Sequence, residues 1–323
     1  MLKLIKIELV KVIYGKSVWI SILCALLAVL GFGILMNMDD AFDDYRSQEE
    51  IMLEEKYENS NDWKEKLEIQ MELNQLMSDV YSQEKIDMDN SILEYEINND
   101  LEPYAHNTTW DFIAYTFRIL NVVLIIISIW ITTEMIMSEY VNKTYKLVYT
   151  KAYKRWEIYV SKYISSIITI SLIAVMMLIM AWIVGGIIFG FDGISSRTAI
   201  CLYGKMMAIS LGGKAMLYMA FAIVKAIAVS SIAFLIAELT KNQVIAVIVT
   251  IVCSFWGKML LTKIINNGVA IGKYSLFMHY DLVSFIDSPI VYNGTAMISA
   301  TIIAVHLILF LVFGMLVNKG EDL

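Results

Sequence analysis

Six long apolar runs constrain this chain more than any other feature of its sequence. They cover residues 18–36, 110–137, 163–189, 215–239, 244–261 and 294–317. A helix needs about 20 apolar residues to cross the hydrocarbon core of a bilayer, and lipid offers no hydrogen-bond partner to an open backbone. The sequence is 58% hydrophobic, above the range of about 45–50% for soluble domains. It therefore predicts an all-α integral membrane protein with six transmembrane helices.

Charge divides the chain into an acidic block and a basic remainder. Residues 37–109 contain 21 acidic and five basic side chains, whereas the other residues contain 11 acidic and 20 basic ones. Basic loops next to transmembrane helices stay preferentially on the cytoplasmic side. We therefore expect a protein of the bacterial plasma membrane. Residues 37–109 should lie outside the cell, and the basic stretch 138–162 and both termini should lie in the cytoplasm.

The transmembrane pattern suggests three regions along the chain. Residues 1–36 are interpreted as an interfacial elbow helix followed by the first transmembrane helix, and residues 110–323 contain the other five. The acidic region 37–109 is predicted to form an extracellular helical hairpin, with helices over 60–85 and 90–98. This hairpin is either a lid, gate or docking site for a cationic peptide, or a solvated spacer.

The stretch 138–162 carries six basic residues, and its aromatic and aliphatic side chains recur at roughly helical spacing. A short cytoplasmic helix lying against the membrane or a protein partner accounts for this pattern. A helix that only connects two spans accounts for it equally well.

The same stretch resembles the intracellular coupling region of ABC-2-type transporter permeases, the membrane subunits of many bacterial exporters. That pattern has an acidic-aromatic pair, Gly-Thr-x-Lys, a Pro-x-Ser-Arg turn and a Ser-Lys pair entering the next span. The corresponding segments here are Glu139-Tyr140, Lys143-Thr144-Tyr145-Lys146, Ala152-Tyr153-Lys154-Arg155 and Ser161-Lys162. Lys143, Ala152 and Lys154 depart from the pattern, since they replace Gly, Pro and Ser.

The resemblance implies a permease subunit that exports an amphipathic antimicrobial peptide, lipid-like molecule or drug. ATP and magnesium are then expected in separate ABC ATPase subunits, and a second permease, identical or different, is expected beside this one. Membrane lipid is an expected partner and nucleic acid is not. The residues implied to couple this chain to the ATPase are Glu139, Thr144, Tyr145, Leu147, Tyr153, Lys154, Arg155 and Trp156.

Other function classes leave weaker traces in the sequence. No segment has the phosphate-binding pattern Gly-x-x-x-x-Gly-Lys-Ser/Thr; around Lys214, for example, Ala208 and Ala215 break it. We therefore do not expect this chain to hydrolyse ATP itself, and the resemblance to a permease subunit implies that it is not an enzyme. A membrane sensor or scaffold, whose extracellular region detects a ligand without transport, is the alternative. A secondary transporter is less favoured, because such proteins commonly show paired intramembrane carboxylates or spans broken by Gly or Pro, and the predicted spans contain no proline.

Lys225 stands near the middle of the predicted fourth span. A lysine there costs about 2.5–3.5 kcal/mol on the insertion scale, and no acidic residue lies within four positions. We expect Lys225 to face the pathway or the subunit interface and to meet a lipid phosphate, a substrate carboxylate or a carboxylate of the partner permease. Otherwise it snorkels to a headgroup from a shifted span.

The remaining features are less specific. Residues 199–211 are apolar enough to lie in the membrane interface or to re-enter it, and residues 262–293 resemble the outer re-entrant helices of ABC-2-type permeases. The histidines and the three cysteines lack metal-ligand spacing, so no metal site is expected.

Overall fold

The computed structural model of the chain describes residues 1–37, 48–104, 107–144, 153–287 and 295–319. Within these residues, six helices are long and apolar enough to cross a membrane. They are α2 (Lys16–Asn37), α7 (Asn121–Val141), α9 (Arg155–Phe189), α10 (Leu211–Thr240), α11 (Gln243–Asn266) and α13 (Ala296–Lys319). The prediction of a helical multi-pass membrane protein is confirmed.

Helix α10 lies at the centre of the bundle. It packs against α7, α9, α11 and α13, and also against the short helix α6 (Thr109–Ile119). Many of its contact residues are small, and Ala222, Ala226 and Ala233 are fully buried. Small residues let neighbouring helices approach closely in a membrane. By contrast, α2, α11 and α13 leave much of their apolar surface exposed, as helices facing lipid do.

The second predicted span, 110–137, is two helices rather than one. Helix α6 ends at Ile119 and α7 begins at Asn121. The Asn121 side chain donates a hydrogen bond of 2.7 Å to the carbonyl of Arg118, which satisfies a backbone group at the break. Because α7 alone has 21 residues, it is still long enough to span a bilayer.

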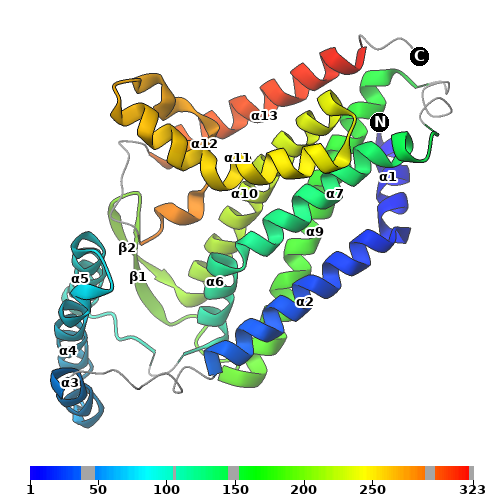
Figure 1. The fold of residues 1–323 in the computed structure, drawn as a ribbon. Coiled ribbons are helices and arrows are strands. Elements are labelled where there is room, and N and C mark those ends of the chain that lie inside the picture. Colours follow the sequence, from blue (N-terminus) through cyan, green and yellow to red (C-terminus); the bar gives the residue numbers. More distant parts are fainter. Residues whose placement is uncertain (38–47, 105–106, 145–152, 288–294, 320–323) are drawn as a thin grey trace.

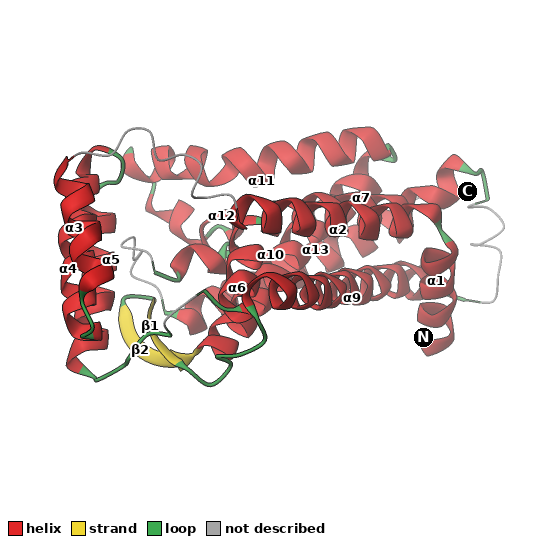
Figure 2. Cartoon of the chain, turned by 90° about the horizontal axis from the view of Figure 1, so that it is seen from below, coloured by secondary structure: helices red, strands yellow, loops and turns green. Residues whose placement is uncertain are grey.

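The acidic region folds as helices α3 (Gln48–Asn59), α4 (Trp63–Leu76) and α5 (Gln83–Asn98), with the 3-10 turn η2 (Met77–Asp79) between the last two. The predicted continuous helix over 60–85 is wrong. Its apolar pattern counted Val80, which is 75% exposed, and serines at 78 and 82 compete with helical hydrogen bonding. Helix α5 begins at Gln83, so it also includes residues 86–89, which separated the two predicted helices. Figure 2 shows the three helices side by side, running across the end of the bundle.

Residues 199–211 belong mostly to a β-hairpin rather than to an interfacial or re-entrant segment. Strand β1 (Arg197–Leu202) pairs antiparallel with β2 (Lys205–Ser210). Tyr203 and Gly204 form the turn, and both have positive φ angles, as a two-residue hairpin turn requires. Glu96 of α5 accepts the backbone N–H of Ala199 at 2.7 Å. The hairpin therefore joins the acidic helices to the bundle.

Region 262–293 contains the last turn of α11 and then three short helical elements. These are the 3-10 helix η3 (Ala270–Tyr274), α12 (Leu276–His279) and the 3-10 helix η4 (Leu282–Phe285). Helix α1 (Leu2–Tyr14) and the last turn of α13 lie at one end of the bundle, while α3–α5 and the hairpin lie at the other (Figure 1). The acidic and basic segments are thus separated along the bundle, as the charge pattern predicted.

Candidate functional site

Helix α7 ends in a turn that fixes the start of the predicted coupling stretch. The N–H of Thr144 donates to the carbonyl of Glu139 at 2.9 Å, and the N–H of Lys143 donates to the carbonyl of Tyr140 at 3.1 Å. This pair of bonds is a Schellman motif, which needs a left-handed residue. Lys143 has that conformation, with φ of 56°, and it occupies the position where the resembling permeases have glycine.

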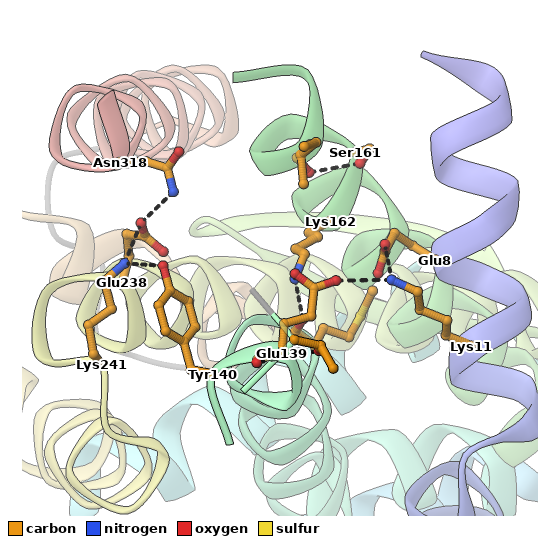
Figure 3. Close-up of polar contacts among 12 residues, drawn as sticks. Glu8, Lys11, Glu139, Tyr140, Ser161, Lys162, Glu238, Lys241 and Asn318 are labelled. Atoms are coloured by element: carbon orange, nitrogen blue, oxygen red, sulfur yellow. Dashed lines mark hydrogen bonds and ion pairs between the residues drawn. The ribbon is translucent and has the colours of Figure 1, made fainter. Parts of the chain in front are cut away.

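Glu139, in the last turn of α7, links two other helices. Its Oε1 lies 3.0 Å from the ammonium of Lys11 in α1, and its Oε2 lies 2.9 Å from that of Lys162 in α9. Lys11 also contacts Glu8 at 2.7 Å, and Lys162 donates to the carbonyl of Met135 at 3.1 Å. Figure 3 shows both lysines converging on the Glu139 carboxylate. Glu139 and Lys162 are buried, so this is an internal ionic contact.

The neighbouring Tyr140 makes the corresponding link on the other side of α7. Its hydroxyl accepts a hydrogen bond of 3.0 Å from Lys241, which follows α10 directly. Lys241 in turn contacts the carboxylate of Glu238 at 2.7 Å. The same Glu238 oxygen accepts the side-chain amide of Asn318 in α13, also at 2.7 Å. This chain of contacts is visible on the left of Figure 3.

Two adjacent residues therefore connect the end of α7 to four other helices. We call this set the Glu139–Tyr140 hub; its members are Glu8, Lys11, Glu139, Tyr140, Lys162, Glu238, Lys241 and Asn318. Charge-assisted hydrogen bonds are shorter and stronger than neutral ones, and an unpaired charge in this position is costly. A displacement of the end of α7 would reach α1, α9, α10 and α13 together through these contacts.

The carboxylates of the hub keep the Lys11 side chain protonated. Burial by itself lowers the pKa of the Lys11 ammonium, but the hydrogen bonds and negative charges of Glu8 and Glu139 outweigh burial and raise that pKa above its ordinary value. A raised lysine pKa means that the stabilising contribution is complete at neutral pH and is lost only in strongly alkaline solution. A cavity of about 380 Å³ opens beside these groups, between α1 and α7.

The other residues implied by the resemblance fall into two groups. Tyr153, Lys154, Arg155 and Trp156 lie at the start of α9, where Tyr153 and Trp156 are exposed. Tyr145 and Leu147 lie outside the described residues. The ends of the predicted stretch are not a separate helix: residues 138–141 belong to α7 and residues 155–162 to α9. With 35 residues, α9 is about 52 Å long, which exceeds the hydrocarbon thickness of about 30 Å.

Lys225 lies far from the hub, and its partner belongs to the same chain. Its ammonium is 2.9 Å from the carboxylate of Asp281, between α12 and η4, and 3.4 Å from the side-chain oxygen of Asn121. The lipid, substrate or second-subunit partner that we expected is therefore replaced by an internal carboxylate, which comes from outside α10 as the local sequence required.

Sequence reasoning missed most members of the hub. Lys11 and Glu139 are 128 positions apart, and no local pattern connects them. One signal was available: Glu238 and Lys241 are spaced three residues apart at the end of an apolar run, a spacing that brings side chains together on a helix. Among the described residues, no group of three His, Cys, Asp or Glu side chains could hold a metal ion.

These features define a helical multi-pass membrane protein whose long helices are joined at one end by a buried ionic hub. Residues 76–323 match the family described as "Protein of unknown function (DUF2705)", and the chain belongs to that family. The match includes every hub member except Glu8 and Lys11. The chain is also similar to "Uncharacterized protein YhcI" of Bacillus subtilis (strain 168), with 25% identity over 329 residues that cover 99% of each chain.

Proposed function

We propose that this chain is the membrane-spanning permease subunit of an ATP-driven ABC exporter in a bacterial plasma membrane. The observation that carries the proposal is the Glu139–Tyr140 hub. It lies at the segment that resembles the ABC-2-type coupling region, and it connects that segment to α1, α9, α10 and α13. A structure that only joined two spans would not need buried charges linking so many helices.

The exposed aromatic residues beside the hub supply the contact surface in this proposal. Tyr153 and Trp156 are exposed at the start of α9, next to the basic side chains of Lys154 and Arg155. Aromatic anchors at a protein interface are worth about 2 kcal/mol or more each, and rim charges usually less. An ATPase subunit docked here would use Tyr153 and Trp156 as anchors.

In this mechanism, a movement at the end of α7 is passed through the hub to two pairs of helices. ATP, held with magnesium in the ATPase subunits, closes their dimer and displaces residues 142–154. Glu139 transmits the displacement to α1 and α9, and Tyr140 transmits it to α10 and α13. Since α10 contacts most of the bundle, its tilt changes the pathway between this chain and a second permease subunit, identical or different.

The cargo in this proposal is amphipathic: a peptide, a lipid-like molecule or a drug. Helices α3–α5 form an acidic unit at the end of the bundle opposite the hub. A negative surface raises the arrival rate of cationic molecules, and the gain falls with salt. This favours a cationic peptide, with the acidic unit outside the cell and both termini in the cytoplasm.

The proposal is tested by purifying the tagged chain from membranes of the cells that produce it naturally. We expect an ATPase with Walker A and signature motifs to copurify, and to hydrolyse ATP in the recovered complex. Recovery of the chain with no such ATPase, but with a signalling or cell-wall enzyme, would instead indicate the alternative, a sensor or scaffold.

A further inference from the structure

After α11 the chain folds back onto the bundle, where it contacts four elements: α10, α11, α13 and β1. We call residues 270–287 the return segment; it contains η3, α12 and η4, drawn in orange in Figure 1. It lies at the end of the bundle opposite the hub. Its buried apolar side chains, Leu276, Leu282 and Phe285, pack with residues of α10 and α13. This packing places the segment over the core.

Each neighbour of the return segment also holds it by a polar contact. The Tyr280 hydroxyl donates to the carbonyl of Ser254 in α11 at 2.6 Å. The His279 ring nitrogen Nδ1 lies 3.0 Å from the hydroxyl of Ser299 in α13. The N–H of Asp287 donates to the carbonyl of Cys201 in β1 at 2.8 Å. These contacts join neutral groups or involve the backbone.

The Lys225–Asp281 contact to α10 is different because it joins two full charges at short range; the segment's other ion pair with α10, between Lys214 and Asp287, is longer, at 3.9 Å. Lys225 lies fourteen residues after the start of α10, about 21 Å along the helix axis, and only 9% of it is exposed. Its ammonium contacts Asp281 at 2.9 Å and lies 5.9 Å from the ring centre of Tyr280. The residues on either side along α10, Ala222 and Val229, are fully buried. Of the two side chains in contact, that of Lys225 is 11% exposed and that of Asp281 is 24% exposed, so little water reaches the pair.

A buried ion pair such as Lys225–Asp281 is favourable either in direct contact or fully separated and hydrated, but not in between. With the carboxylate in contact, each charge compensates the other. When the segment moves away, both charges must be hydrated, because either one alone in a low-dielectric environment is strongly unfavourable. The pair therefore makes the position of the segment nearly all-or-none.

We propose that the return segment is a lid and that the Lys225–Asp281 ion pair is its latch. While the pair is formed, the segment covers the inner faces of α10, α11 and α13 at this end. When the pair separates, water enters and the faces become accessible. The lid stands independently of the ATPase proposal, because it concerns access at this end and not the source of energy. In an exporter it would close the exit.

The test measures access to Ser254, which lies beneath Tyr280. The three native cysteines are replaced, Ser254→Cys is introduced, and its labelling rate by a hydrophilic maleimide is measured in nanodiscs. Lys225→Met and Asp281→Asn each remove one charge, and we expect either to raise the rate by about tenfold or more, since removing one partner of a buried pair is strongly unfavourable. Lys263→Met, which removes an exposed charge from α11, should leave the rate unchanged.

The charge exchange separates a latch from general loosening. Lys225→Asp combined with Asp281→Lys restores an ion pair, and we expect its labelling rate to return most of the way to that of the parent. Asp281→Asn preserves side-chain shape and gives a folded comparison if Lys225→Met does not fold, as judged by size-exclusion profile. An unchanged rate in folded Asp281→Asn overturns the proposal. So does a fast rate that the exchange fails to lower.

Discussion

Lys143 holds a backbone conformation that usually belongs to glycine. Its positive φ completes the Schellman motif after α7, and a side chain in that conformation costs about 1–2 kcal/mol. A glycine also gains entropy in the unfolded chain, so the net benefit of replacement is smaller. We predict that Lys143→Gly raises the free energy of unfolding by about 0.5–1 kcal/mol. The measurement is the thermal midpoint of the purified protein, which should rise.

The adjacent Asn142 provides the control for this prediction. Its φ is −81°, which any residue adopts, so Asn142→Gly gains nothing in the folded state. We expect the midpoint of that variant to be unchanged or lower. If both glycine substitutions stabilise equally, the conformation of Lys143 is not the cause.

The two lysines that contact Glu139 should contribute unequally to stability. The Lys162 side chain is 5% exposed and that of Lys11 is 48% exposed. Removing one partner of a buried pair costs about 3–5 kcal/mol, whereas an exposed pair is worth about 0–1 kcal/mol. Lys162→Met should therefore lower the free energy of unfolding by about 3 kcal/mol and Lys11→Met by less than about 1 kcal/mol. Equal losses in matched denaturation curves would contradict this description of the hub.

Among the elements, α13 and α9 approach closely at a glycine. A Cβ atom built on Gly314 would lie 1.8 Å from the hydroxyl oxygen of Tyr159 in α9. Tyr159 is buried and stacks edge-to-face on Phe234, with 4.9 Å between ring centres, so it cannot move aside freely. We predict that Gly314→Ala lowers the free energy of unfolding by about 1–3 kcal/mol.

A second substitution shows whether the hydroxyl is responsible. Tyr159→Phe removes the clashing oxygen, so adding it to Gly314→Ala should recover part of the lost stability, as read from thermal unfolding. Gly31→Ala, which meets nothing within 4 Å, serves as the control and should be neutral or slightly stabilising. A double variant no better than Gly314→Ala would place the strain elsewhere.

The long helices were predictable from sequence, and the short elements were not. A run such as 163–189 must be helical in lipid because its backbone has no other partner. In the acidic region, by contrast, water competes for every hydrogen bond, so the periodicity of residues 60–85 did not decide where α4 ends. The β-hairpin depends on the turn at Tyr203-Gly204 and on Glu96, which lies about 100 positions earlier in the chain.

The candidate site was also predictable from the sequence only in part. Glu139 was identified because it belongs to a recognisable local pattern. Its partners Lys11 and Lys162, and the partner of Lys225, depend on how helices pack, which single-sequence periodicity does not encode. The need for a partner was nevertheless predictable, since a lysine such as Lys225 is unfavourable alone in a membrane; its identity, Asp281, required the structure.

For the whole molecule, the separation of charge predicts the orientation. Single cysteines are introduced by Asn61→Cys and Asn142→Cys, both at exposed positions, after replacement of the native cysteines. A membrane-impermeant thiol reagent on intact cells should label only position 61, and position 142 should react only after permeabilisation. Labelling of position 142 in intact cells would reverse the orientation and remove the hub from the cytoplasmic side.

The measurement closest to the central claim compares two pairs of exposed aromatic residues. One pair, Tyr153 and Trp156, lies at the start of α9 beside the hub; the other, Tyr81 and Tyr104, lies in the connections that precede and follow α5, among the acidic helices. Each pair is replaced by alanine, and the ATPase that copurifies with equal amounts of chain is quantified. We predict a loss of about tenfold or more for Tyr153→Ala with Trp156→Ala and parental recovery for Tyr81→Ala with Tyr104→Ala. Parental recovery for both pairs would contradict the assignment of the hub end as the site where the ATPase drives this permease.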